Sequence, residues 1–316
     1  MAKISVSGAA FAGLGVIRRH PGAVLTWGVV MLVLSLLPVL GLIAVMGPQM
    51  MKILPAILAS GRDGAVADQA MMGQILQLQS GVMLLQIVGW LWDTLVKALL
   101  CAAVFRAVLR PDQSRNAFLR IGPQELWLTL LFLVVSVLAY IVAIIASIVV
   151  MLPAFIVGAT SGAQGQGVAA GVMTAVGLGL VAVAVLTWLS LRLSMAAPMT
   201  FVDGQFRLFE SWSLTRGAAW RLLGVAVLNL VLLFVIELVV AGIVLTALFA
   251  LGGPPVWLND AKAIEAFLSQ PLPDLLSDVW PWLAVGGAVW ILIGSGLFTI
   301  FCAPWAAAYK DLTRPA

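Results

Sequence analysis

The stretch "ELWLTLLFLVVSVLAYIVAIIASIVVMLPAFIV", Glu125–Val157, decides the fold of this chain. After its first residue it holds no charged side chain, and it is longer than the roughly 20 apolar residues that carry a helix across a bilayer. It also lacks the strict alternation of polar and apolar residues that is typical of barrel strands. We therefore predict a transmembrane helix over 125–157.

The composition of the whole chain agrees with this prediction, since 63% of the 316 residues are hydrophobic and only 9% are charged. Soluble proteins carry about 25% charged residues. Similar apolar runs predict six spans, over residues 21–47, 82–108, 125–157, 168–200, 222–251 and 280–306. The first run is too long for a signal peptide and has no cleavage site, so it is a retained span. We expect an all-α integral membrane bundle, one transmembrane domain over 1–316.

The basic residues predict which side of the membrane each loop faces. Twelve lie before the odd-numbered spans or after the even-numbered ones: Lys3, Arg18, Arg19, Arg106, Arg110, Arg115, Arg120, Arg207, Arg216, Arg221, Lys310 and Arg314. The opposite loops hold only Lys52, Arg62 and Lys262. Cytoplasmic loops carry the excess of Lys and Arg, so we expect a multi-pass protein of the bacterial inner membrane with both termini in the cytoplasm. This topology accounts for the net charge of +4 without a nucleic-acid partner.

Two segments in the loops opposite the predicted cytoplasmic side have patterns typical of additional helices. Between Pro48 and Gly81 lies a glutamine-rich amphipathic piece, "MMGQILQLQ". Farther on, Asn259 or Asp260 is a suitable cap for a short helix, "DAKAIEAFLSQ", which Pro271 ends. Three of its residues fall on one face and predict a surface position: Ile264, Phe267 and Leu268.

The segments of the predicted cytoplasmic side resemble one another. The odd-numbered spans follow "FAGLGVIRRHPGAVLTW", "NAFLRIGPQELWLTL" and "SWSLTRGAAWRLLGV", and the even-numbered spans end in "CAAVFRAVLR", "AAPMTFVDG" and "CAPWAAAYKDL". We predict three tandem units, at about 10–110, 115–203 and 207–312, each a short amphipathic helix at the cytoplasmic face followed by a helical hairpin.

The stretch "FESWSLTRGAAWRLLG", Phe209–Gly224, is such an amphipathic segment and its turn into the fifth span. Phe206, Phe209 and Trp212 form its apolar face, and Gly217 allows the turn. The residues that we expect at the headgroup layer are Arg207, Trp212, Arg216, Trp220 and Arg221. The alternative is an ordinary belt of aromatic and basic residues that only fixes the depth of the helices.

The same stretch and the end of the chain resemble the bacterial family known as the membrane domain of glycerophosphoryl diester phosphodiesterase. The matching positions are Ser211, Trp212, Leu214, Thr215, Gly217, Trp220, Leu223 and Gly224, then Tyr309, Asp311 and Leu312. The resemblance implies a six-span-like helical protein. The family takes its name from members that fuse this region to a soluble phosphodiesterase barrel, and no segment here offers the Glu, Asp and His cluster of metal-assisted hydrolysis. The resemblance therefore implies no activity.

Polar residues within the spans are the other candidates, because ionisable groups are costly at membrane depth. They are Asp93, Lys97, Tyr140, Arg192, Asn229 and Glu237. Asp93 and Lys97 are four residues apart, so they share a helix face and can pair. Tyr140 is placed to donate a hydrogen bond to Glu237 across the bundle.

Two interpretations of these polar residues stay open. Structural pairing between helices is one. The other is a polar cavity in which Glu237 carries a proton and Lys97 or Arg192 holds an anion.

Small residues in the fourth predicted span indicate close helix packing. Gly167 and Gly171 form a GxxxG pair, and we expect Gly177 and Gly179 to extend the small surface.

The sequence has few of the residues and motifs that commonly act in catalysis or metal binding. Cys101 and Cys302 lie in apolar runs and are expected to be buried without a disulfide, and His20, the single histidine, lies at the headgroup boundary. Nucleotide-binding and G-x-S-x-G motifs are absent from the sequence. We therefore expect no catalytic residue, no metal and no cofactor.

The sequence leaves the function open among three hypotheses. The first is a non-catalytic scaffold or accessory subunit that organises lipids or a protein partner at its cytoplasmic face. The second is a transporter or carrier of a small anion or lipid. The third, a membrane-embedded lipid enzyme, lacks a nucleophile or metal cluster to support it.

Overall fold

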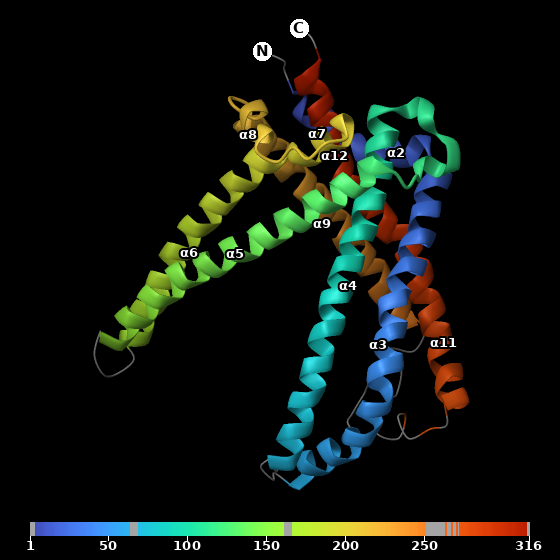
Figure 1. The fold of residues 1–316 in the computed structure, drawn as a ribbon, viewed down its shortest axis with the longest axis vertical. Helices are drawn as coiled ribbons and strands as arrows, with labels where there is room; N and C mark the ends of the chain where they lie inside the picture. The colour runs from blue at the N-terminus through green and yellow to red at the C-terminus, as the bar shows by residue number, and fades with distance from the viewer. Residues whose placement is uncertain are drawn as a thin grey trace. The chain divides into compact units, whose positions relative to one another are not determined.

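The computed structural model describes residues 4–63, 69–160, 166–250, 263, 267, 270 and 272–314. Every regular element among these residues is helical (Figure 1). The first half comprises α1 (Val6–Ala10), α2 (Ala12–Arg19), α3 (Pro21–Asp63), α4 (Gln69–Leu109), η1 (Pro111–Gln113) and η2 (Arg115–Phe118). The second half comprises α5 (Pro123–Thr160), α6 (Gln166–Leu193), α7 (Ala196–Asp203), α8 (Glu210–Leu214), α9 (Ala219–Ala250), α11 (Leu272–Val289), η4 (Trp290–Gly294) and α12 (Ser295–Thr313).

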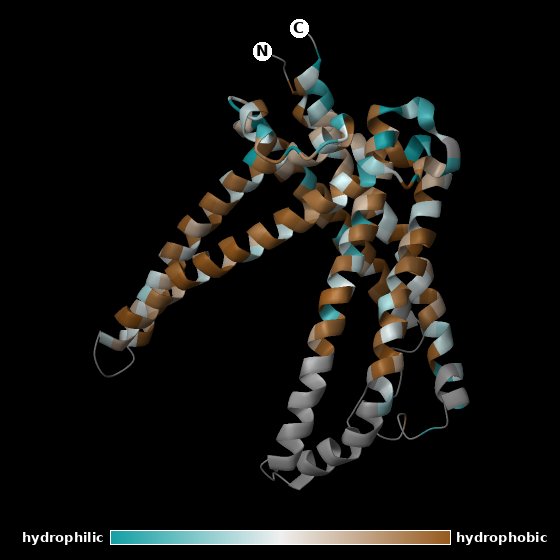
Figure 2. Ribbon diagram, in the orientation of Figure 1, coloured by the Kyte–Doolittle hydropathy of each residue, from teal (hydrophilic) through white to brown (hydrophobic). Residues whose placement is uncertain are grey.

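The predicted all-α membrane fold is confirmed. Six helical stretches in the described part of the chain are long and apolar enough to cross a membrane: Pro21–Val45, Val82–Leu109, Asn116–Thr160, Gly167–Asp203, Ala219–Thr246 and Ser277–Thr313. Each overlaps one predicted span. Figure 2 shows the apolar residues along the shafts of these helices, with polar residues concentrated in the short elements beside their ends.

The helices of the first two spans are longer than the membrane requires. α3 runs to Asp63 and α4 starts at Gln69, so the backbone of "MMGQILQLQ" belongs to α4 instead of a separate element. The predicted helix "DAKAIEAFLSQ" lies outside the described residues apart from Ala263, Phe267 and Gln270, among which Phe267 is buried.

The chain divides into two compact units, of which the first contains Met1–Leu32, Val104–Phe118 and Trp220–Ala316. Within it, α1 and α2 pack on α12. Gly13 of α2 makes this packing possible, because a Cβ there would lie 2.5 Å from Cα of Ile300. The backbone N–H of Ser5 donates to Oδ2 of Asp311 over 3.2 Å. The two ends of the described chain therefore lie side by side.

Two side chains of the first unit hold an unusual turn. Asn116, Ala117 and Phe118 have positive φ angles of 56°, 52° and 64°, a conformation that costs L-residues about 1–2 kcal/mol each. The indole Nε1 of Trp27 donates to the carbonyl oxygen of Ala117 over 2.7 Å, and Nη1 of Arg106 donates to that of Phe118 over 2.7 Å. Hydrogen bonds from two helices thus stabilise this left-handed turn.

The second unit contains Val33–Ala103 and Leu119–Ala219. In it α5 and α6 run side by side as a hairpin (Figure 1). The predicted glycine contact is confirmed for Gly171, because a Cβ there would lie 2.8 Å from the oxygen of Ala154 and 3.2 Å from Cα of Gly158. Gly177 and Gly179 have no other atom near the position of a Cβ. The prediction that they extend this contact is wrong, because the two helices approach closely only near the hairpin's turn.

Candidate functional site at the end of α6

The second unit brings several of the predicted polar and aromatic residues together where α6 ends. The last carbonyl groups of a helix have no partner within the helix, and two hydroxyls of the α8 segment fill part of this need. Oγ of Ser211 donates to the carbonyl oxygen of Arg192 over 2.7 Å and accepts from the backbone N–H of Met195 over 3.2 Å. Oγ1 of Thr215 lies 3.4 Å from the same oxygen of Arg192. These bonds fix α8 against the end of α6.

The guanidinium group of Arg192 lies against two indole rings at this junction. Its Cζ is 5.5 Å from the ring centroid of Trp188 and 5.7 Å from that of Trp212, which is within cation–π range. The two rings contact each other edge to face, with centroids 5.0 Å apart and an interplanar angle of 87°. Trp188 comes from α6 and Trp212 from α8, so the rings join the two helices. We call Trp188, Arg192 and Trp212 the arginine–tryptophan cluster.

The hydrogen-bonding capacity of Arg192 is unmet inside the protein. Its Nε and Nη1 atoms are buried, and neither has a hydrogen-bond partner in the described part of the chain. A guanidinium group is always charged in proteins and carries five N–H donors. The cation–π contacts offset part of the cost of burying these donors, but they supply no acceptor oxygen.

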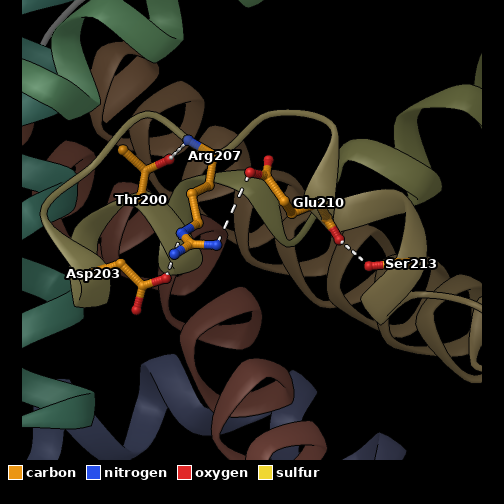
Figure 3. Close-up of polar contacts among 5 residues, drawn as sticks. All are labelled: Thr200, Asp203, Arg207, Glu210 and Ser213. Carbon is orange, nitrogen blue, oxygen red and sulfur yellow. Dashed lines mark hydrogen bonds and ion pairs between the residues drawn. The ribbon is translucent and has the colours of Figure 1, made fainter.

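Arg207, on the short segment between α7 and α8, is neutralised by its neighbours instead (Figure 3). Its Nε lies 2.7 Å from Oδ2 of Asp203, and its Nη1 lies 3.9 Å from Oε1 of Glu210. The backbone N–H of Arg207 also donates to Oγ1 of Thr200 over 3.2 Å. Gly204 ends α7 in the left-handed conformation that commonly closes a helix. Arg207 is therefore paired with carboxylates close to it in the sequence, and about a third of its side chain is still exposed.

The remaining headgroup candidates are exposed. Trp220 is 85% exposed and Phe209 is 73% exposed, and Arg216 and Arg221 are exposed as well. Gly217 has a φ angle of 82°, so the predicted turn before α9 does require glycine.

The other intramembrane candidates are Asp93, Lys97, Tyr140, Asn229 and Glu237. Asp93 and Lys97 form the predicted pair, with Nζ of Lys97 2.6 Å from Oδ2 of Asp93 and about half of each side chain exposed. Tyr140 and Glu237 are also exposed. They belong to different units, so their hydrogen bond stays a prediction. Asn229 is buried in α9, where its Oδ1 atom has no partner among the described residues.

Two residues with structural roles were not singled out from the sequence. Arg106 was expected among the basic loop residues, but it is buried and bonded to the turn at Phe118. Glu125 is also buried, in the first turn of α5, where a negative charge suits the helix dipole. An acid in a first helical turn is a signal that the sequence did offer. Arg106 lies in an apolar run whose neighbouring residues Phe105 and Ala107 are buried as well.

Other expectations concern the cysteines and metal sites. Cys101 and Cys302 are buried and form no disulfide, as predicted. Within the described ranges, no group of three His, Cys, Asp or Glu residues lies close enough together to hold a metal ion.

Comparison with known proteins does not add a family to this description. No family model matches the chain, and no curated protein or solved structure matches it either. The resemblance to the membrane domain of glycerophosphoryl diester phosphodiesterase stays a prediction from the residues that carry it.

Proposed function

We propose that this multi-pass membrane protein is a non-catalytic scaffold of the bacterial inner membrane that organises anionic lipids at its cytoplasmic face. One observation carries the proposal: large aromatic side chains and arginines are exposed together on the short elements beside the helix ends. Phe11, Arg18 and Arg19 are all exposed in the α1–α2 region, Trp212 and Arg216 are exposed in and just after α8, and Trp220 is exposed at the start of α9. Rings in the headgroup layer and arginines at anionic phosphates are how interfacial segments bind a membrane.

The assignment to the cytoplasmic face follows from charge. Arg18, Arg19 and Arg216 all lie in the loops that hold twelve of the basic residues. The cytoplasmic leaflet carries anionic lipids, and each Lys or Arg near its surface contributes about 1 kcal/mol of attraction. A protein partner at the same face is the other form of the scaffold hypothesis.

The polar residues of the spans give a second candidate function, a carrier of a small anion or lipid. Glu237 favours it, because an exposed carboxylate within an apolar helix needs a polar neighbour or a proton. Asp93 and Lys97 weigh less for it, since they already neutralise each other.

The lipid composition around the protein tests the scaffold proposal. The wild-type protein is extracted with its surrounding lipids in a polymer disc, and the anionic fraction of those lipids is compared with that of the bulk membrane. We expect enrichment in the wild type and a lower anionic fraction for the double variant Arg19→Gln, Arg216→Gln. Arg62→Gln is the matched control, because the charge pattern assigns Arg62 to the opposite side.

Two results would contradict the scaffold proposal. One is an anionic fraction equal to that of the bulk membrane in the wild type. The other is turnover of a phospholipid, or uptake of an anion into proteoliposomes, that is lost in Glu237→Gln. Uptake of that kind would favour the carrier.

A further inference from the structure

We propose that the arginine–tryptophan cluster binds the phosphate group of one phospholipid molecule. This inference deepens the proposed function and rests on it, because it names one binding site within a surface that gathers anionic lipids. The ligand class follows from the donors of the cluster, from the charges around it and from the helix face below it.

The donors of the cluster lack an acceptor that the protein could supply. Nε and Nη1 of Arg192 are buried without a hydrogen-bond partner in the described ranges, while the residue as a whole is half-buried. An anion would approach the guanidinium group from the exposed part of this side chain. The described chain also offers no acceptor to the indole N–H groups of Trp188 and Trp212, whose side chains are partly exposed. A phosphate oxygen is a suitable partner for a planar guanidinium fork and accepts hydrogen bonds from indoles as well.

The local carboxylates do not compete for Arg192. Asp203 and Glu210 both lie beside Arg207 (Figure 3), and no carboxylate in the described ranges lies within 4.0 Å of a nitrogen of Arg192. The charge of Arg207 is thus offset internally, while that of Arg192 is not. An added anion would complete the cluster instead of displacing an existing pair.

The face of α6 below the cluster favours a lipid over a free anion. Val181, Val185 and Trp188 precede Arg192 by eleven, seven and four residues, so they lie on the same face of the helix. All three are exposed. This apolar stripe is about 16 Å long at 1.5 Å per residue, comparable to an acyl chain. A phosphate at Arg192 would place the attached chains along the stripe.

Native mass spectrometry of the full-length protein in mild detergent tests the site. The probes are phosphatidylglycerol, a diacylglycerol without phosphate, and inorganic phosphate. We expect one phosphatidylglycerol to remain bound to the wild type. Arg192→Gln should weaken this binding at least about tenfold, since a charge-assisted hydrogen bond is lost. Arg207→Gln, the matched control, should bind as the wild type does.

Two further variants guard against a loss that merely reflects unfolding. Arg192→Lys keeps the charge but not the fork, so we expect it to bind more weakly than the wild type and more tightly than Arg192→Gln. Trp188→Leu removes one ring of the cluster. Because that ring also contacts Trp212, we expect a small fall in the melting temperature measured without lipid, and weaker binding at temperatures where the variant is still folded.

The outcomes separate this site from the proposed function. Equal retention of phosphatidylglycerol by the wild type and Arg192→Gln would contradict the proposed site. The scaffold proposal would still hold if anionic lipids were enriched around the wild type. Equal retention of diacylglycerol, or displacement of the lipid by inorganic phosphate at a similar concentration, would overturn the assignment to a phospholipid. If the wild type enriched no anionic lipid at all, the proposed function itself would fail.

Discussion

Arg106 in α4 and Arg192 in α6 both lie in the last turns of a spanning helix, yet the protein satisfies them in opposite ways. Arg106 is 2% exposed and donates to the carbonyl oxygen of Phe118 over 2.7 Å. Arg192 lies against two rings, with two buried nitrogens that have no acceptor in the described chain. The first arginine is part of the internal packing. The second is the residue to which we assign a ligand.

The backbone beside each arginine shows the same difference. The turn that Arg106 bonds to has three successive residues at positive φ, Asn116, Ala117 and Phe118, and it depends on donors from other helices. The segment beside Arg192 is held by its own hydroxyls, those of Ser211 and Thr215. Removing the arginine should therefore damage the first region and leave the second folded.

The largest effect is expected from the matched pair Arg106→Met and Arg192→Met. Arg106→Met leaves a buried carbonyl at Phe118 without this donor and should lower the free energy of unfolding by about 2–3 kcal/mol. Arg192→Met removes donors that are already unsatisfied, so its effect should stay within about 1 kcal/mol. Equilibrium unfolding in mixed detergent micelles measures both. Equal losses in the two variants would show that the two arginines contribute equally to the free energy of unfolding, against this prediction.

The second pair tests what holds α8 to α6. The hydroxyl of buried Ser211 bonds to two backbone groups of the α6 end, whereas the hydroxyl of exposed Ser213 donates to the carbonyl oxygen of Glu210 in its own helix. We expect Ser211→Ala to cost about 1–2 kcal/mol and Ser213→Ala to cost less than about 0.5 kcal/mol. The same unfolding assay compares them. A neutral Ser211→Ala would mean that the arginine–tryptophan cluster, and not the hydroxyl, fixes α8.

The features that could be predicted from the sequence are those set by short-range patterns. Length and apolar composition were enough to locate the spans, and a four-residue spacing was enough to pair Asp93 with Lys97. Gly217 was recognised as a turn because no other residue enters the left-handed region as easily. In each case the physical cause lies within a few residues of its effect.

The features that could not be predicted depend on contacts between distant segments. The bond from Trp27 to Ala117 spans ninety residues, and the carbonyl group that Arg106 bonds to lies twelve residues away in another element. The arginine–tryptophan cluster needs Trp188 and Trp212 from different helices. The prediction for Gly177 and Gly179 was wrong for the same reason. A stripe of small residues in one helix does not show how far a second helix stays in contact with it.

A smaller effect, of opposite sign, should come from relieving the left-handed turn. Ala117 has a φ angle of 52°, a conformation that glycine adopts without steric cost. Ala117→Gly should therefore raise the free energy of unfolding by about 0.5–1 kcal/mol. Ala184→Gly, in the exposed middle of α6, should lower it by a similar amount. If Ala117→Gly is also destabilising, the bonds from Trp27 and Arg106 do not hold a strained backbone.

The smallest effect is expected at Arg207, which completes the comparison because it is the arginine that carboxylates neutralise. About a third of its side chain is exposed, and exposed ion pairs contribute between about 0 and 1 kcal/mol. Arg207→Gln should lower the free energy of unfolding by no more than that, and the loss should shrink further in high salt because salt screens exposed charges. Unfolding curves at low and high salt measure the difference. A loss above about 2 kcal/mol that salt does not reduce would mean that Arg207, like Arg106, is part of the internal packing, and that of these three arginines Arg192 is the one with a charge available to a ligand.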